Sequence, residues 1–488
     1  MAEEHKRPSM EANEAVDVCK TESDRLGAVT EMQLDPEMER KTLRKFDMCL
    51  LPQIAVLIII GYLDRTNIGN AVVFGFAQDI NLQGREFNNL VTLFYVTYIV
   101  FDIPWVVSIK KFGANRVLGV ALLGWSAATL GTGFVHNYHQ ALACRLVLGF
   151  FEAGLLPSII FIISTIWNKR QQGKRIAVIY CATTISGAFG GLFAYGVQSM
   201  GNRAGLEPWR WLFIVEGIIS FVVGGLCWVT MPFSAEKAWF LTKEQSEFML
   251  LKKQRDVLYK GEDTFKTRYV WSAVTDLLVY LVAFSLFASS LPLLGFGTFL
   301  PTIIRGFGYT SIQANYLTIP VYAVATISVG IISWASDKLH KRALFLFMVP
   351  IPVLIGYSIA LGTANIGAGY FAMFMCAVGI FPFNCIMLTW VTSNLAPDYK
   401  RSVGVPFAAT IANISGILSG QIYPATDGPR YISGNGVSLG LEFVAFCGVV
   451  SIYCLLRYRN KKKEEILATG VESNGKEGDA SLQFKYVL

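Results

Sequence analysis

Charged residues are scarce in this sequence. Asp, Glu, Lys and Arg make up 16% of the 488 residues, whereas hydrophobic residues make up 53%. A soluble domain typically carries about 25% charged residues, so this chain has too little charge to cover the surface of a soluble protein of its size. The composition therefore excludes an ordinary soluble protein and predicts one whose surface faces lipid.

The sequence also lacks the patterns of metal sites, disulfide frameworks and common enzymes. Its nine cysteines form no Cys-x-x-Cys pair and, apart from Cys19, lie in or beside apolar segments, where free cysteines act as small packing residues. Its four histidines have no ligand-like spacing. No phosphate-binding loop, serine-hydrolase elbow or zinc-protease motif is present. We therefore expect no metal, no cofactor and no catalytic activity.

The net charge of +7 is not gathered into a nucleic-acid-binding stripe, because the basic residues are scattered through short loops. Nucleic acid is therefore not an expected partner. Most of these basic residues lie in alternate loops between apolar segments, a distribution typical of the cytoplasmic side of a membrane protein. We expect both termini on that side. The residues are Lys110, Lys111, Arg116, Lys169, Arg170, Lys174, Arg175, Lys338, Lys341, Arg342, Lys400 and Arg401.

Twelve apolar segments are long enough to cross a bilayer as helices. They lie near residues 48–74, 88–109, 114–135, 138–166, 174–200, 209–232, 272–304, 313–336, 342–362, 367–393, 402–424 and 437–457. A charged loop between Pro232 and Val270 divides them into six and six. The sequence thus predicts an all-α membrane protein of twelve transmembrane helices in two six-helix halves, an architecture typical of secondary transporters.

These segments define five expected regions. They are a disordered cytosolic tail (1–46), an N-terminal six-helix half (47–232), a cytosolic linker (233–269), a C-terminal six-helix half (270–457) and a second cytosolic tail (458–488). The linker contains a capped, amphipathic surface helix, and we expect it to connect the halves without a role in the transport chemistry.

The fourth span carries two opposite charges, Arg145 and Glu152. Seven residues make about two helical turns, so both charges share one face, with Gly149 near that face to admit another helix. An ionisable residue in hydrocarbon must face protein or a water-filled cavity. The pair indicates a pathway for something charged, and the alternative is a structural salt bridge between helices.

The first span contains the adjacent residues Asp64 and Arg65. Neighbours on a helix point about 100° apart, so each needs a separate partner. Arg145 is available for Asp64, and either Glu152 or an anionic ligand is available for Arg65, whose planar guanidinium suits a carboxylate. The alternative is a pair near the outer interface that extends into the headgroups.

Other polar residues lie inside apolar spans, among them Asn384 and Asn413. Both are candidate substrate contacts, although an asparagine in a membrane helix more often hydrogen bonds to a neighbouring helix.

The sequence resembles a known family at three places. The stretches Tyr62-Leu-Asp64-Arg65-Thr-Asn67-Ile-Gly-Asn70, Arg145 to Pro157 and Trp209-Arg210-Trp211 to Glu216-Gly217 are similar to those of the anion:cation symporters of the major facilitator superfamily. Within that family the chain looks most like the fungal allantoate permease branch, which includes carriers for allantoate, nicotinate, pantothenate and related small carboxylates. The resemblance runs from about Lys45 to Arg457 and implies the major facilitator fold.

The resemblance also implies roles for individual residues. The family's proton-linked carboxylates fall on Glu152 and Asp64, its substrate arginine on Arg65 and a basic partner on Arg145. Tyr62, Tyr98 and Asn413 fall where relatives contact substrate. We expect Glu152 to carry the coupling proton and Asp64, nearer the outer end, to admit it. One departure is the loop Lys110 to Arg116, which lacks the superfamily's usual acidic residue.

These observations predict a monomeric, multi-pass plasma-membrane protein that imports a small organic anion together with protons by alternating access. An exporter of metabolites or drugs with the same fold is one alternative. A nutrient sensor that no longer transports is another, although its signalling tails would be expected to be longer than those of this chain.

Overall fold

The computed structural model describes residues 35–167, 169–260, 267–339, 341–396, 398–469, 474 and 478–488. By internal contacts the chain forms two compact units, one of Met1–Pro52 with Met231–Lys266 and one of Gln53–Thr230 with Thr267–Leu488. Both predicted six-helix halves lie almost entirely in the second unit. The predicted tail up to residue 34 lies outside the described residues.

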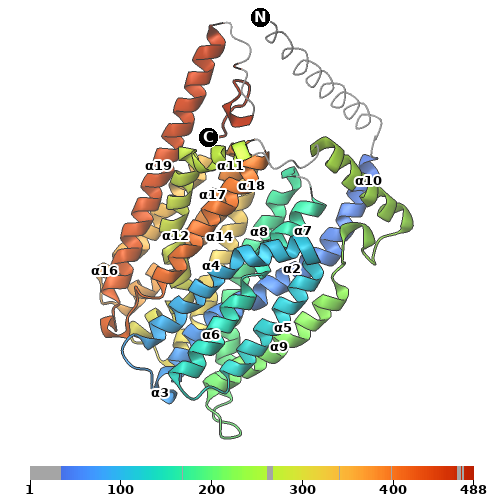
Figure 1. Cartoon of the computed structure of the whole chain (residues 1–488). Coiled ribbons are helices and arrows are strands. Elements are labelled where there is room, and N and C mark those ends of the chain that lie inside the picture. Colours follow the sequence, from blue (N-terminus) through green and yellow to red (C-terminus); the bar gives the residue numbers. More distant parts are fainter. Residues whose placement is uncertain are drawn as a thin grey trace, which may run out of the picture. The chain divides into compact units, whose positions relative to one another are not determined.

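All twelve predicted spans are helical (Figure 1), and the described residues contain no named strand, so the predicted all-α fold is confirmed. The first six spans correspond to α2 (Pro36–Val73), α4 (Glu86–Phe112), α5 (Ala114–Thr132), α6 (Tyr138–Glu152) with α7 (Leu155–Ile166), α8 (Lys169–Ser199) and α9 (Pro208–Thr230); the short α3 (Phe76–Asp79) follows α2.

The last six spans follow the short α11 (Thr267–Val274). They are α12 (Leu277–Gly306), α13 (Ser311–Tyr316) with α14 (Thr318–Leu339), α15 (Arg342–Met348) with α16 (Pro350–Gly362), α17 (Ile366–Asn394), α18 (Asp398–Ser419) and α19 (Ile432–Ala468). Of the described helical segments, nine are both long and apolar enough to cross a membrane. The other three predicted spans are α5, α6 with α7, and α18.

Polar residues cap helices whose interiors are apolar. Asn137 Oδ1 accepts the Gln140 backbone N–H at 3.0 Å at the start of α6, and Asn365 caps α17 in the same way. Each cap satisfies one of the backbone N–H groups that a helix leaves unpaired at its first turn. These caps mark the residues at which α6 and α17 begin.

The fourth span is interrupted immediately after Glu152, although the sequence predicts a continuous helix there. Helix α6 ends at Glu152 and α7 begins at Leu155, after a turn at Ala153 and Gly154. Pro157 has no N–H to donate to the carbonyl of Ala153, four residues earlier, so the ladder breaks at this point. Interrupted helices in membrane transporters commonly mark a binding site.

Both helical ends of the chain reach further than the sequence predicts. Helix α2 begins at Pro36, inside the expected tail that ends at residue 46, and α19 continues to Ala468 rather than ending near residue 457. Outside the bilayer a helix needs no apolar face, so the apolar runs mark only the minimum length of each helix. Glu37 and Glu39 in the first turn of α2 also suit the positive end of its dipole.

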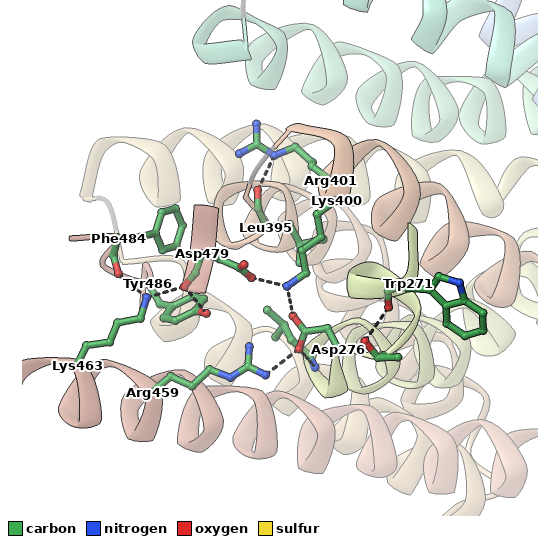
Figure 2. Close-up of polar contacts among 12 residues, drawn as sticks. Trp271, Asp276, Leu395, Lys400, Arg401, Arg459, Lys463, Asp479, Phe484 and Tyr486 are labelled. Atoms are coloured by element: carbon green, nitrogen blue, oxygen red, sulfur yellow. Dashed lines mark hydrogen bonds and ion pairs between the residues drawn. The ribbon is translucent and has the colours of Figure 1, made fainter. Parts of the chain in front are cut away.

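The last residues fold back onto the end of the C-terminal helices (Figure 2). Lys400 Nζ lies 2.5 Å from Asp276 Oδ2 and 2.7 Å from Asp479 Oδ2, while Arg459 reaches the other oxygen of Asp276 at 2.7 Å. Asn394 exchanges two hydrogen bonds with the backbone of Val487. The described part of the expected C-terminal tail is therefore ordered around a buried lysine.

The first unit combines the start of α2 with the linker helix α10 (Lys243–Lys260) and the short η1 (Ala235–Lys237). Lys45 donates to Gln245 Oε1 at 2.7 Å, Lys252 lies 3.3 Å from Glu39, and Phe46 meets the ring of Phe240 edge-on. The predicted surface helix of the linker is present and packs against α2.

Candidate functional site

Arg65 and Glu152 form an ion pair between α2 and the end of α6. Arg65 Nε and Nη2 lie 3.0 and 2.6 Å from the same oxygen, Glu152 Oε1. Glu152 is 1% exposed, and its second oxygen accepts no hydrogen bond from any described residue. Glu152, one of the two partners predicted for Arg65, is thus present, but only one of its oxygens bonds to the guanidinium.

Aromatic side chains of α4 surround the Arg65 guanidinium. Its central carbon lies 4.8 Å from the ring centre of Tyr98, 5.5 Å from that of Phe94 and 5.8 Å from that of Tyr95. Cation–π contacts of this kind attract a guanidinium to the ring faces. The Arg65 side chain remains 16% exposed, so a ligand can reach Arg65 more easily than Glu152.

Gly149 allows α4 to approach this pair. A Cβ atom at residue 149 would lie 2.2 Å from Thr97 Oγ1 and 2.5 Å from the Phe94 carbonyl oxygen, which is far too close for any side chain. The close helix approach expected at Gly149 is confirmed, and it positions Phe94 and Tyr98 beside Arg65.

Asp64 does not pair with Arg145, contrary to the option that the sequence offers. Asp64 Oδ2 accepts hydrogen bonds from the indole of Trp125 on α5 and, at 3.2 Å, from Ser220 Oγ on α9. Neutral donors therefore replace the expected arginine. Arg145 is 3% exposed, stacks on Phe213 at 5.8 Å, and has two guanidinium nitrogens, Nε and Nη2, with no acceptor among the described residues.

The relative depth of Asp64 and Glu152 in the membrane stays a prediction. Arg65, the neighbour of Asp64, bonds directly to Glu152, so the two carboxyl groups belong to the same region of the structure.

The remaining candidates divide into two groups. The Tyr62 hydroxyl faces α12, since a Cβ atom at Gly297 would lie 3.1 Å from it. Asn413 is half-buried and lies one turn from Gly416, which packs on Tyr95 beside Arg65. Asn384, in contrast, is engaged by α12 and its own helix, through hydrogen bonds with Ser290, Ser289 and Ile380, which favours the structural role.

The two six-helix groups meet tightly at one end, where α4 begins and α18 ends. Asn88 donates to the Gly420 carbonyl at 2.6 Å, and Thr92 donates to the Ile417 carbonyl at 3.0 Å. Gln421 also donates to Thr92 Oγ1 at 2.9 Å. These contacts lie about one to three helical turns beyond Tyr98 and Asn413, towards that end.

Sequence reasoning did not identify Trp125 or Ser220. Trp125 lies in the middle of the α5 span, and a tryptophan there, away from the membrane interface where it is usually found, was the available signal. Ser220 follows Glu216 by one turn of α9, so it shares a helix face with the buried acidic residue of that span.

The sequence matches the family model described as Major Facilitator Superfamily over residues 54–420. It is 37% identical to an uncharacterised transporter of Schizosaccharomyces pombe over 95% of this chain and 93% of that protein. It is also 32% identical to the high-affinity nicotinic acid transporter of Saccharomyces cerevisiae, over 92% of this chain and 85% of that protein.

Solved structures of low sequence identity share the fold. A bacterial homologue of the human lysosomal transporter Spinster, in an inward-facing and unoccupied conformation, matches with a TM-score of 0.64 at 14% identity, over 86% of this chain and 97% of that one. A proton:xylose symporter matches with a TM-score of 0.62 at 14% identity, over 84% and 95%.

Proposed function

This chain belongs to the Major Facilitator Superfamily and is a membrane transporter rather than an enzyme, and from that premise we propose that it imports a small organic carboxylate together with protons. The observation that carries the proposal is the Arg65–Glu152 pair, a partly exposed guanidinium held by one oxygen of a buried carboxylate. We further propose that it belongs to the anion:cation symporters, in the allantoate permease branch.

A substrate carboxylate can replace Glu152 on Arg65. The guanidinium fork can donate to both oxygens of a carboxylate, whereas only one oxygen of Glu152 accepts from it. Tyr98, Tyr62 and Asn413 then surround the remainder of the substrate. An aromatic carboxylate such as nicotinate fits this description, because Phe94, Tyr95 and Tyr98 supply ring faces around Arg65.

Replacement of Glu152 by the substrate carboxylate also couples substrate binding to proton binding. A carboxylate that loses its guanidinium in a buried site is costly as an anion, so Glu152 takes up a proton when substrate displaces it. Substrate and proton then bind together, and the loaded site carries the same charge as the empty one. Glu152 is thus the proposed coupling residue, with Asp64 as a second proton-linked carboxylate.

Transport proceeds by movement of the two six-helix halves, 47–232 and 270–457, about this site. The distribution of Lys and Arg in the loops supports a cytoplasmic location for both termini and the linker. In this orientation the contacts of Asn88, Thr92 and Gln421 lie on the outer side, and they close the site from outside. The protein functions as a monomer in the plasma membrane.

Uptake by the purified protein in liposomes tests the proposal, with nicotinate as the first probe and a panel of small carboxylates beside it. We expect an inward proton gradient to drive accumulation, and substrate entry to acidify the lumen. Thermal unfolding provides a second measurement, because a ligand that binds the folded state raises its stability. Lumen alkalinisation on substrate entry would identify an exchanger instead, and no response to any carboxylate would overturn the substrate class.

A further inference from the structure

Two buried carboxyl groups, Asp64 of α2 and Glu216 of α9, lie outside the Arg65–Glu152 ion pair. Asp64 and Glu216 are each 1% exposed. Hydrogen bonds place Ser220 level with Asp64 and Asn67 level with Glu216, so the two helices run antiparallel here. Glu216 lies one turn from Ser220 and so stands beside Asp64.

Neutral donors occupy only one oxygen of each carboxyl group. Trp125 and Ser220 donate to Asp64 Oδ2, and Asn67 donates to Glu216 Oε2 at 2.6 Å. Asp64 Oδ1 and Glu216 Oε1 are buried and accept no hydrogen bond from any donor that the structure describes. The two free oxygens are the ones left for contact between the carboxyl groups.

A network fixes the orientation of Asn67. Asn70 Nδ2 donates to Asn67 Oδ1 at 2.8 Å, which leaves the Asn67 amide nitrogen to face Glu216. An amide held in this way can donate to Glu216 but cannot accept from it. Glu216 can therefore present a proton only from its other oxygen, towards Asp64.

Charge counting over Asp64, Glu216, Arg145 and the neighbouring Arg65–Glu152 pair requires a proton. The ionisable groups are the carboxyl groups of Asp64, Glu152 and Glu216 and the guanidinium groups of Arg65 and Arg145. Among the described residues, the contacts from α5 and α8 include the neutral Trp125 and Gly190. Three carboxylates against two cations leave one uncompensated negative charge, which a buried site does not tolerate. One shared proton removes it.

We propose that Asp64 and Glu216 form a carboxyl–carboxylate pair that holds one proton between α2 and α9 and is a second proton-binding site of the transport cycle. The pair binds the proton through the two otherwise free oxygens, since two adjacent carboxyl groups can hydrogen bond to each other only when one is protonated. Asp64 was assigned a proton-linked role from the sequence, whereas Glu216 had none. The functional part of this inference rests on the proposed proton coupling.

Arg145 is the cation that can compensate the charge of Asp64 and Glu216 when their shared proton is absent. Its Nε and Nη2 are buried without an acceptor among the described residues, although its charge acts on Glu216, Asp64 and Glu152. When the shared proton leaves for water, the pair becomes two carboxylates, and a shift of Arg145 towards them compensates the added charge. Proton release and a movement of α6 against α2 and α9 are then linked.

Infrared spectroscopy of the purified protein in liposomes tests the shared proton without any substrate. A protonated carboxyl has a C=O band distinct from that of a carboxylate. We expect this band in the wild type at neutral pH, and we expect its intensity to fall by the same amount in Glu216→Gln, Asp64→Asn and the double variant, because a single proton is shared. Glu442→Gln is the matched control, since Glu442 is also fully buried but lies on α19; its effect should add to that of Glu216→Gln.

A band whose intensity is unchanged in the double variant, or that falls in only one single variant, overturns the shared pair. A second measurement addresses its role in transport. Proton-driven accumulation of nicotinate should fall at least tenfold in Glu216→Gln, while exchange of nicotinate for nicotinate is retained. If the infrared result holds but accumulation is normal, the pair is structural and the second coupling site is wrong. If the wild type does not move nicotinate, the proposed substrate fails while the infrared result still decides the pair.

Discussion

Gly69 of α2 and Thr298 of α12 bring the two six-helix groups into backbone contact. A Cβ atom at residue 69 would lie 1.8 Å from the Thr298 carbonyl oxygen and 2.9 Å from its carbonyl carbon. Since a carbonyl cannot move away as a flexible side chain can, only glycine fits when the helices are this close. The contact lies near the end of α2, on the side where α4 also bonds to α18.

Gly69→Val should therefore destabilise the arrangement that is closed at this end and favour one in which α2 and α12 have separated. A cysteine introduced at Thr92, in the α4–α18 contact, should react faster with a membrane-impermeant maleimide in this variant. Gly330→Val on α14 is the control, because a Cβ there would meet no atom within 4 Å. Equal reaction rates in both variants would mean that Gly69 does not hold the outer end closed.

Arg65→Lys tests the substrate anchor. Lysine keeps the positive charge but loses the planar fork that binds both oxygens of a carboxylate, and it also loses the stacking surface on Tyr98. We expect nicotinate uptake to fall at least tenfold, with protein yield and surface delivery unchanged. Normal uptake kinetics in Arg65→Lys would remove Arg65 from the binding site.

The helical architecture could be predicted from the sequence, and so could the burial of the charged residues inside the spans. Long apolar runs, and isolated charges within them, have few structural interpretations. The partners of those charges could not be predicted. Asp64 bonds to Trp125 and Ser220 rather than to Arg145, and this depends on how helices distant in sequence pack. The break after Glu152 also needs tertiary support, since a glycine and a proline alone do not decide whether a span bends or stops.

The buried lysine at the end of the C-terminal helices gives a prediction about pH. Burial acts to raise the pKa of Asp276, but the hydrogen bond from Arg459 and the charge of Lys400 outweigh it and leave that pKa below its usual value. Burial keeps the pKa of Asp479 above its usual value despite the hydrogen bond from Lys400. Of these two carboxyl groups, Asp276 is therefore the one that is more stable as an anion in the folded protein than in the unfolded chain.

Asp276→Asn should consequently lower thermal stability at pH 7 by more than Asp479→Asn does, with a cost on the order of 3 kcal/mol for breaking a buried ion pair. The stabilisation from Asp276 is complete above the usual aspartate pKa of about 3.9 and is lost as the pH falls through the lowered pKa of the folded state. Thermal unfolding in detergent at pH 7 and below pH 4 measures this. Equal losses in the two variants, or a difference that grows on acidification, would contradict it.

The linker prediction can be tested by dividing the chain. Helix α10 ends at Lys260, and its described contacts include the start of α2 and η1 within the linker itself. Co-expression of residues 1–262 with 263–488 keeps α10 whole and should restore nicotinate transport, whereas division between residues 250 and 251 cuts α10 and should restore less. Stable assembly of 1–262 with 263–488 without transport would indicate that the intact linker does more than connect the halves.

Glu152→Gln tests the coupling mechanism itself. Glutamine has nearly the shape of a protonated glutamate but cannot release a proton, and it leaves Arg65 without its anionic partner. Substrate should then bind without having to displace a carboxylate, so its affinity should depend less on pH than in the wild type. We expect exchange of nicotinate across the membrane to persist, while accumulation driven by an inward proton gradient is abolished.

The control is Glu247→Gln, which changes an exposed carboxyl on α10 and should leave both activities unchanged. Comparison of uptake in liposomes with and without the gradient separates the two activities, and a Glu152→Gln protein that still concentrates nicotinate in response to protons would show that another residue carries the coupling proton.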